Sequence, residues 1–444
     1  MTLMISVSGV RGIIGEKMTP MLAAEMGAAF GSHVGGGVVV LGRDSRPSGE
    51  MLQTALKSGL MACGCRVVEL GIVTTPGVAL MIGERSAAGG VVITASHNPG
   101  EWNGIKFLTS EGCAPPPELS QKIFERYDRK QYAFVGADRV GTAERDLGTH
   151  DAHVAKVCGV LDVEMIRRRQ LCVVLDSVNG AGGLGGRMLL DRLGCKLIHI
   201  NGEPDGKFAH TPEPTEANLR GLCEAVREHR ADVGFAQDPD ADRLAVVDQS
   251  GRYIGEEYTI VLAAKHILSQ RAGPIAVNLS TSRMVEDVAK TAGPDAVVHR
   301  TPVGEANVAR AVLEKGCILG GEGNGGVIDP RVVAVRDSFV AMGLILNLLA
   351  SDWRPLGAIV DEMPRYVMIK RKFEADRDAI QAWLERVRMS SAGRIDDSDG
   401  LRIDWPEGWV HVRPSNTEPI ARVIAEAADE PTAAALAERV TELF

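Results

Sequence analysis

A repeated pattern of short apolar strand, polar turn and helix constrains the fold of this chain more than any other feature. Three apolar runs lead into a polar turn and then a helix-like segment, at residues 38–41, 172–175 and 275–279. Each helix leads to another short apolar run, at residues 66–70, 196–200 and 296–299. Strand, turn, helix and strand in this order form the α/β unit, so we expect three related mixed α/β domains.

The pattern changes at about Arg365, which predicts a smaller α+β fourth domain. Residues 365–372 alternate like an edge strand, and residues 376–387 have the apolar period of an amphipathic helix. Short strands at 400–404 and 409–413 follow, and then a helix at 432–444. The predicted domains are residues 1–150, 151–252, 253–364 and 365–444, with the first boundary in a polar segment, 148–154, before the next helix.

The composition is that of an ordinary globular protein and argues against several classes. Of the 444 residues, 45% are apolar and 24% are charged, and the formal net charge of −9 argues against a nucleic-acid scaffold. No apolar run reaches the length of a membrane-spanning helix, and residues 341–350 are typical of a buried helix. The sequence opens without a basic and apolar leader, so we expect no secretion.

The eight cysteines are scattered and show no metal-finger spacing. Cys63 and Cys65 form the only close pair in the sequence. Cys172 and Cys195 lie in apolar surroundings, so we expect them to be core thiols. This usage favours a reduced, cytoplasmic protein.

The stretch from Val91 to Lys106 carries a candidate nucleophile. Four strand-favouring residues lead to Ser96, and Asn-Pro-Gly then halts the run, so we expect Ser96 at the mouth of a strand in an exposed turn. His97 is its neighbour, and the ammonium of Lys106 follows ten residues later. Such a serine can carry a phosphoryl group. An Asn-Pro turn with an incidental serine is the alternative.

Three carboxylates at alternate positions, Asp238, Asp240 and Asp242, lie between two apolar strands. They would repel one another strongly unless a cation joins them, and hard oxygen ligands suit Mg²⁺. A calcium EF-hand loop fails, because its required Gly and Glu positions hold Arg243 and Gln249. A solvated acidic turn is the other alternative.

Two further loops offer contacts for a sugar phosphate. The Gly-rich run at 320–326 carries Glu322 and Asn324, which can bond vicinal hydroxyls while glycines let the backbone approach a ligand. The run from Arg413 to Pro419 offers a guanidinium, hydroxyls and an amide for a phosphate. Each is also compatible with a plain turn. Arg11 lies between glycines near the start, and alone it indicates little.

Together these loops resemble those of the α-D-phosphohexomutase family. The motifs are TASHNP, DPDADR, GEGNGG and RPSNTEP, one per predicted domain and in that order. The likeness covers the whole chain, including SGVRG, GRDSRPSG and the TPVG turn at 301–304. It implies three topologically similar α/β domains and a fourth helix-plus-sheet domain around a central cleft, each contributing one loop.

The resemblance assigns a role to each matching residue. Ser96 corresponds to the phosphorylated serine, which also supplies a metal oxygen, and Glu322 to the glutamate that holds sugar hydroxyls. The Mg²⁺ ligands are Asp238, Asp240 and Asp242. The active-site cations are Arg11, Lys106 and Arg243. The loop for the non-transferring phosphate holds Arg413, Ser415, Asn416 and Thr417.

The implied reaction interconverts a hexose 6-phosphate and a 1-phosphate. Phosphoserine passes its phosphoryl group to the sugar, the 1,6-bisphosphate turns over in the cleft, and Ser96 takes back the other phosphate. A hexose 1,6-bisphosphate would then act as activator, and closure of the fourth domain would exclude water. Either His97 or Lys106 handles the hydroxyl proton. We expect small sugar phosphates as partners, no nucleic acid or membrane, and a monomer or homodimer.

One departure concerns the sugar loop, where many relatives have Ser-Gly-His and this chain has Asn324-Gly325-Gly326. The lost imidazole leaves the roles of Asn324 and Gly326 open. The GEGNGG form is most like the branch that acts on glucosamine phosphate, with mannose and glucose phosphates as alternatives. A serine phosphatase and a non-catalytic sugar-phosphate sensor are the rival functions, and the phosphate cradle and the intact nucleophile and metal loop argue against them.

Overall fold

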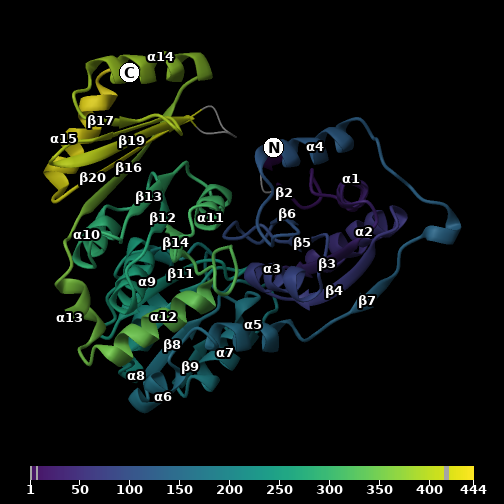
Figure 1. Cartoon of the computed structure of the whole chain (residues 1–444), viewed down its shortest axis with the longest axis horizontal. Helices are drawn as coiled ribbons and strands as arrows, with labels where there is room; N and C mark the ends of the chain where they lie inside the picture. The colour runs from purple at the N-terminus through teal and green to yellow at the C-terminus, as the bar shows by residue number, and fades with distance from the viewer. Residues whose placement is uncertain (1–2, 7–8, 415–419) are drawn as a thin grey trace.

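The computed structural model of the chain describes residues 3–6, 9–414 and 420–444. Four sheets organise these residues, and we call each sheet with its helices domain I, II, III or IV in chain order. Figure 1 shows domain I at the right, domains II and III below and to the left, and domain IV above domain III at the top left. The predicted residues Ser415, Asn416 and Thr417 lie outside the described part of the chain.

Domain I contains a mixed seven-stranded sheet in the order β1-β2-β6-β5-β3-β4-β7. Strand β3 pairs in parallel with β4 and β5, and β6 pairs antiparallel with both β5 and β2. Its strands are β1 Met4–Ser6, β2 Gly9–Ile13, β3 Val38–Arg43, β4 Arg66–Ile72, β5 Gly89–Ile93, β6 Trp102–Thr109 and β7 Ala143–Arg145. Its α-helices are α1 Pro20–Val34, α2 Gly49–Ala62, α3 Thr75–Glu84 and α4 Pro117–Asp128, with a 3₁₀ turn η1 at Ala137–Arg139.

Domains II and III each contain a four-stranded sheet with a parallel core and one antiparallel hairpin strand. The order in domain II is β11-β10-β8-β9, from strands β8 Cys172–Asp176, β9 Lys196–Ile200, β10 Val233–Gln237 and β11 Leu244–Asp248. The order in domain III is β13-β12-β14-β15, from strands β12 Ile275–Asn278, β13 Val298–Thr301, β14 Leu319–Glu322 and β15 Gly326–Ile328. Because both faces are covered, strands such as β10 are buried along their whole length.

Helices cover both sheets. Those of domain II are α5 Thr149–Cys158, α6 Val163–Arg169, α7 Gly182–Arg192 and α8 Arg220–His229, with a 3₁₀ turn η2 at Glu216–Asn218. Those of domain III are α9 Glu257–Gln270, α10 Met284–Thr291, α11 Glu305–Glu314, α12 Ser338–Ser351 and α13 Leu356–Asp361. Among the described residues, no helix is both long and apolar enough to cross a membrane.

Domain IV is an antiparallel five-stranded sheet with two helices, which confirms the predicted α+β unit. The order is β16-β20-β19-β18-β17, so the predicted edge strand is an edge strand. The strands are β16 Val367–Glu374, β17 Arg394–Asp396, β18 Leu401–Asp404, β19 Gly408–Pro414 and β20 Ile420–Ala427. The helices are α14 Arg377–Ser390 and α15 Glu430–Thr441.

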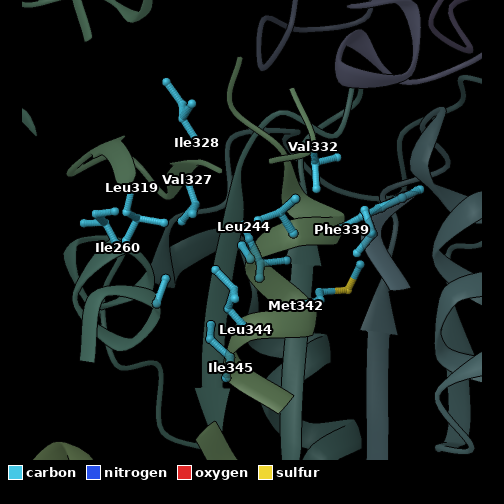
Figure 2. Packing of buried hydrophobic residues seen from close by; sticks show 14 of the residues in the cluster. Leu244, Ile260, Leu319, Val327, Ile328, Val332, Phe339, Met342, Leu344 and Ile345 are labelled. Carbon is cyan, nitrogen blue, oxygen red and sulfur yellow. The ribbon is translucent and has the colours of Figure 1, made fainter. Parts of the chain in front are cut away.

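Helix α12 is the centre of the core that joins domains II and III. Every residue from Ser338 to Ala350 is buried, as predicted for 341–350, because the helix packs on α6 of domain II and α9 of domain III. Figure 2 shows Phe339, Met342 and Ile345 of this helix together with Leu244 of β11 and Ile260 of α9. Domains II and III therefore share one apolar core.

Three local predictions differ from the structure. The segment 148–154 is largely the first half of α5 and not a polar linker, because its apolar residues pack against α3 and α7. The strand expected at 296–299 is β13, two residues later. Cys172 and Cys195 pack against apolar clusters as expected, but they are partly exposed, since they lie at the start of β8 and just before β9. The three domain boundaries stay predictions.

Candidate active site

Ser96 lies three residues beyond the end of β5, as expected for a strand mouth, but the expectation of an exposed turn is wrong. Its residue is 1% exposed, because the loop after β10 and the side chain of Arg46 cover it. The Ser96 backbone has φ +50°, in the left-handed region that costs a residue other than glycine about 1 to 3 kcal/mol. The surrounding contacts hold the serine in this conformation.

The Ser96 hydroxyl points at the acidic loop of domain II. Ser96 Oγ donates to Asp238 Oδ2 at 2.8 Å, although the two residues are 142 positions apart. His97 Nδ1 lies 3.4 Å from the same Oγ. The structure therefore brings together the candidate nucleophile, an imidazole and a carboxylate from the metal loop.

Asp238, Asp240 and Asp242 lie in the tight turn between β10 and β11 and form one buried cluster. Each offers a carboxylate oxygen, and these three atoms lie within 4.8 Å of one another. Burial, with repulsion from Asp242 and Asp240, raises the pKa of Asp238 well above its ordinary value. The buried Oδ1 atoms of Asp240 and Asp242 have no hydrogen-bond partner. Hard oxygen donors, excess negative charge and unused lone pairs together fit a divalent cation such as Mg²⁺.

Lys106 comes from β6 and contacts the same cluster. Its Nζ donates to Asp240 Oδ2 at 2.7 Å and to Asp242 Oδ2 at 3.3 Å. Burial lowers the pKa of Lys106, but the two carboxylates more than offset this effect, and its pKa is raised overall. Lys106 is thus a permanent cation at neutral pH, and it is a poor acceptor for a proton.

His97 and Arg11 are both half-buried, and Arg11 lines the cleft described below. Burial lowers the pKa of His97 to about 3, and the cations Arg243 and Arg11 add to the shift. The imidazole is therefore neutral at pH 7. Arg11, from β2, donates from Nη1 to Asn98 Oδ1 at 3.0 Å, which keeps its guanidinium against the serine loop.

Glu322 lies at the end of β14 and is buried. Its Oε1 accepts from Asn278 Nδ2 at 2.8 Å and from the Gly304 N–H at 3.2 Å. Asn324 Nδ2 lies 3.3 Å from Glu322 Oε2, so the predicted pair does lie together. The turn of the TPVG motif and the Gly-rich hairpin are thus joined at one carboxylate.

Sequence reasoning missed two residues of this centre, Thr75 and Arg336. Thr75, at the start of α3, donates its hydroxyl to Asp240 Oδ2 at 2.6 Å, and its N–H donates to Asp240 O at 3.0 Å. Arg336 donates from Nη2 to Asp242 Oδ2 at 2.6 Å and from Nη1 to Glu322 Oε2 at 2.5 Å. Their partners lie far away in the sequence, and only the excess of carboxylates hinted at a missing cation.

A cleft of about 940 Å³ opens from this centre and takes residues from all four domains. Arg243 lines it with its Nε 3.8 Å from Asp242 Oδ1. Arg413 reaches it from β19, with its Nε 3.3 Å from Asp399 Oδ2. The wall includes Arg11 and Lys106 of domain I, Arg243 of domain II, Glu305, Glu322, Asn324 and Arg336 of domain III, and Asp399 and Arg413 of domain IV.

The chain matches known families along almost its whole length. The phosphoglucomutase/phosphomannomutase alpha/beta/alpha domains I, II and III match residues 3–133, 151–251 and 255–366, and the C-terminal domain of that family matches residues 366–443. The chain belongs to the phosphoglucomutase/phosphomannomutase family. It is therefore a phosphohexomutase, an isomerase of the intramolecular phosphotransferase type.

Relatives in this family carry two different names. A phosphoglucomutase/phosphomannomutase of Thermococcus kodakarensis is 40% identical over 95% of this chain and 94% of its own length. A probable phosphoglucosamine mutase of Methanopyrus kandleri is 36% identical over 98% of this chain and 96% of its own. The family is therefore certain, and the preferred sugar is open.

Solved phosphohexomutases share the arrangement of domains. A phosphoglucomutase/phosphomannomutase family protein of Burkholderia thailandensis superposes with a TM-score of 0.88, at 27% identity, over 99% of this chain and 97% of that one. The N-acetylphosphoglucosamine mutase of Aspergillus fumigatus, solved with GlcNAc-6P and magnesium, gives a TM-score of 0.62 at 15% identity over 99% of this chain and 95% of that one. The second likeness shows the fold alone.

Proposed function

We propose that this phosphohexomutase interconverts a hexosamine 6-phosphate and its 1-phosphate through a phosphoserine at Ser96 and a 1,6-bisphosphate intermediate. One observation carries the proposal. The Ser96 hydroxyl is hydrogen-bonded to an acidic cluster that fits Mg²⁺, at the end of a cleft that all four domains line. A serine phosphatase has no need for the distant contacts of domain IV.

In this proposal Asp238, Asp240, Asp242 and an oxygen of phosphorylated Ser96 would hold one Mg²⁺, whose charge would offset that of the phosphoryl group. Lys106, Arg11 and Arg243 lie around the same point, where fixed cations lower the energy of the transferring group. The bond from phosphorus to Ser96 Oγ breaks as a bond to the sugar hydroxyl forms. The hydroxyl proton passes to His97, whose Nδ1 lies 3.4 Å from Ser96 Oγ, because Lys106 stays protonated. The negative phosphoryl group on Ser96 favours the imidazolium and so raises the low pKa that His97 has without phosphate.

The sugar and its second phosphate take the domain III and domain IV side of the cleft. Glu322 and Asn324 accept hydrogen bonds from the sugar hydroxyls in either orientation of the sugar. Arg413, with Ser415, Asn416 and Thr417, holds the phosphate that is not transferred. One such cradle serves both half-reactions, since the bisphosphate turns over between them, and free hexose 1,6-bisphosphate primes Ser96.

We infer that glucosamine 6-phosphate is the preferred sugar. The probable phosphoglucosamine mutase at 36% identity supports this assignment. The carboxylates of Glu305, Glu322 and Asp399 in the cleft wall are each paired with an arginine, and in this proposal Glu305 also meets the ammonium group of the sugar. Mannose or glucose phosphate is the second candidate, favoured by the relative at 40% identity. A cytoplasmic location and a monomer or homodimer stay predictions.

A coupled assay with Mg²⁺ and a trace of hexose 1,6-bisphosphate tests the assignment. It compares kcat/KM for glucosamine, mannose and glucose phosphates, with Ser96→Ala as the inactive control. A preference of tenfold or more for glucosamine 6-phosphate, about 1.4 kcal/mol of transition-state stabilisation, supports the proposal. A higher kcat/KM for mannose or glucose phosphate would support the mutase chemistry but contradict the assignment of glucosamine 6-phosphate as the preferred sugar.

A further inference from the structure

A buried turn after β3 holds the main chain around the nucleophile. The turn consists of Asp44, Ser45 and Arg46, and both charged side chains are completely buried. Arg46 forms an ion pair with Asp44, and its guanidinium lies 4.9 Å from the centre of the Phe208 ring of domain II. Neither residue lines the cleft, so the turn is separate from the substrate contacts described above.

Arg46 bonds to the serine loop through two main-chain oxygens. Its Nη2 donates to Ser96 O at 2.8 Å and to Asn98 O at 2.5 Å. These carbonyls belong to the residues immediately before and after His97. A single guanidinium nitrogen therefore fixes the direction of the chain as it leaves Ser96.

Asp44 fixes the chain as it enters Ser96. The Ser96 N–H donates to Thr94 Oγ1 at 2.9 Å, and Thr94 Oγ1 donates to Asp44 Oδ2 at 2.7 Å. The Asp44–Arg46 ion pair thus holds both the N–H and the C=O of Ser96. Ser96 has the left-handed φ of +50°, a conformation that persists only where its surroundings impose it.

Domain II closes this turn from the other side. Ser45 Oγ donates to Asn179 O at 2.7 Å. Gly206 has φ +69°, and a Cβ at that position would overlap the Ser45 carbonyl, so the two backbones are in direct contact. The ion pair is consequently shielded from water. In such a buried environment, hydrogen bonds to charged groups are stronger than they are in water.

We propose that Arg46 is a positioning residue for phosphoryl transfer, which rests on the proposed phosphoserine chemistry of Ser96. It touches neither substrate nor the reacting atoms. It holds the Ser96 main chain in the left-handed conformation, and that conformation directs Oγ toward Asp238. Without Arg46 the serine relaxes to an ordinary φ and its oxygen moves away from the metal loop.

Arg331 provides a matched control. It follows Asp329 in the same Asp-X-Arg arrangement, with Arg331 N donating to Asp329 Oδ1 at 3.0 Å, compared with 2.9 Å for Arg46 N and Asp44 Oδ1. Its guanidinium also pairs with the carboxylate of its own turn. Among the hydrogen bonds of the described residues, those of Arg331 stay within that turn and do not reach residues 94–98.

The test compares Arg46→Lys with Arg331→Lys in the full-length protein. A lysine keeps the charge, but its donors all lie on one nitrogen, which cannot hold two carbonyls and a carboxylate in the geometry of the planar guanidinium. We expect kcat to fall about tenfold to a hundredfold in Arg46→Lys, with KM within about twofold, because the loss is one of alignment. The ³¹P resonance of the phosphoserine should shift or broaden in this variant. Arg331→Lys should change neither kcat nor the resonance.

Thr94→Val gives a second route to the same conclusion if Arg46→Lys does not fold. It removes the hydroxyl between Ser96 N and Asp44 with little change in volume, and the same fall in kcat and the same change in the ³¹P resonance are expected. The inference is overturned if folded Arg46→Lys or Thr94→Val retains wild-type kcat and a wild-type resonance. A wild-type protein that glucose 1,6-bisphosphate does not phosphorylate at Ser96 overturns the proposed function instead, and the inference with it.

Discussion

Ser96, Asp238, Lys106 and Arg336 meet at one point although each comes from a different stretch of the chain. The serine and lysine motifs and the three aspartates were predictable from sequence because each is dense in charged or nucleophilic residues within a short loop. The burial of Ser96 was not predictable, and neither were the hydrogen bonds that Thr75 and Arg336 donate to the aspartate cluster. They depend on contacts such as Thr75 Oγ1 to Asp240 Oδ2, which join residues 165 positions apart.

Asp238→Asn tests the metal site at the level of one residue. It replaces one of the three clustered carboxyl groups with a neutral amide and should lower the affinity for Mg²⁺ by about tenfold or more, measured by titration calorimetry and by the Mg²⁺-dependent rise in Tm. Asp248→Asn is the control, since Asp248 is equally buried on the same hairpin but pairs with Arg252. Equal Mg²⁺ affinity in Asp238→Asn and the wild type would contradict the assignment.

Glu257 makes stability depend on pH. Burial raises the pKa of its carboxyl to about 8, although its Oε2 accepts from the Ser282 N–H at 2.9 Å. The folded state therefore binds a proton that the unfolded state releases near its ordinary pKa of 4.5. The contribution of Glu257 to the free energy of unfolding is complete below about pH 4.5 and is lost as pH rises to about 8.

Glu257→Gln should therefore be more stable than the wild type at pH 8 by up to about 4 kcal/mol, and nearly equal to it at pH 4.5. Urea unfolding of both proteins across this pH range measures the difference. A constant difference between the two proteins at all pH values would show that Glu257 is not protonated in the folded state.

At the scale of elements, the repeated α/β unit predicted three strand–helix–strand copies, β3–α2–β4, β8–α7–β9 and β12–α10–β13, because apolar runs and polar turns follow the period of each element. Strand β20 escaped detection, although it lies between two well-predicted neighbours in the domain IV sheet, and so did the short strand β17. The sequence predicts a polar segment before a helix at 148–154, where α5 has already begun, because the exposed residues there are polar. In each case tertiary packing, which is not local in sequence, decided the structure.

Helix α12 depends on its N-cap, Asp337. Its Oδ1 accepts from the Phe339 N–H at 2.9 Å, and its Oδ2 lies 2.6 Å from His153 Nε2 of α5. Asp337→Ala should cost about 2 to 4 kcal/mol of unfolding free energy, since a buried cap and its imidazole partner are lost together. Asp376→Ala removes the exposed cap of α14 and should cost about 1 kcal/mol. Urea unfolding that gave equal losses would contradict this account of α12.

At the scale of the whole molecule, Arg336 and the cleft connect domains that the sequence presents as separate units. Arg336 bridges Asp242 of domain II and Glu322 of domain III, and Asp399 of domain IV accepts from the Val303 N–H of domain III at 2.9 Å. The four motifs predict one loop per domain. Only the folded structure shows that the guanidinium of Arg336 pairs with both the metal loop and the sugar loop.

Glu305→Gln tests the choice of sugar. Glu305 lines the cleft, and its Oε1 accepts from the Arg336 N–H at 2.8 Å and lies 3.7 Å from the Arg336 Nε. We expect kcat/KM for glucosamine 6-phosphate to fall about tenfold, and that for glucose 6-phosphate to change much less, because only the first sugar carries an ammonium group. Equal losses of kcat/KM for both sugars would contradict this role and would indicate that Glu305 serves to hold Arg336 in place.

The measurement that tests the central claim most directly is the intact mass of the protein after incubation with glucose 1,6-bisphosphate and Mg²⁺. The account predicts the addition of one phosphoryl group, located at Ser96 by peptide mapping, absent from Ser96→Ala, and lost again when excess hexose monophosphate is added. A protein that gains no phosphoryl group, or gains it at another residue, would contradict the proposed mechanism.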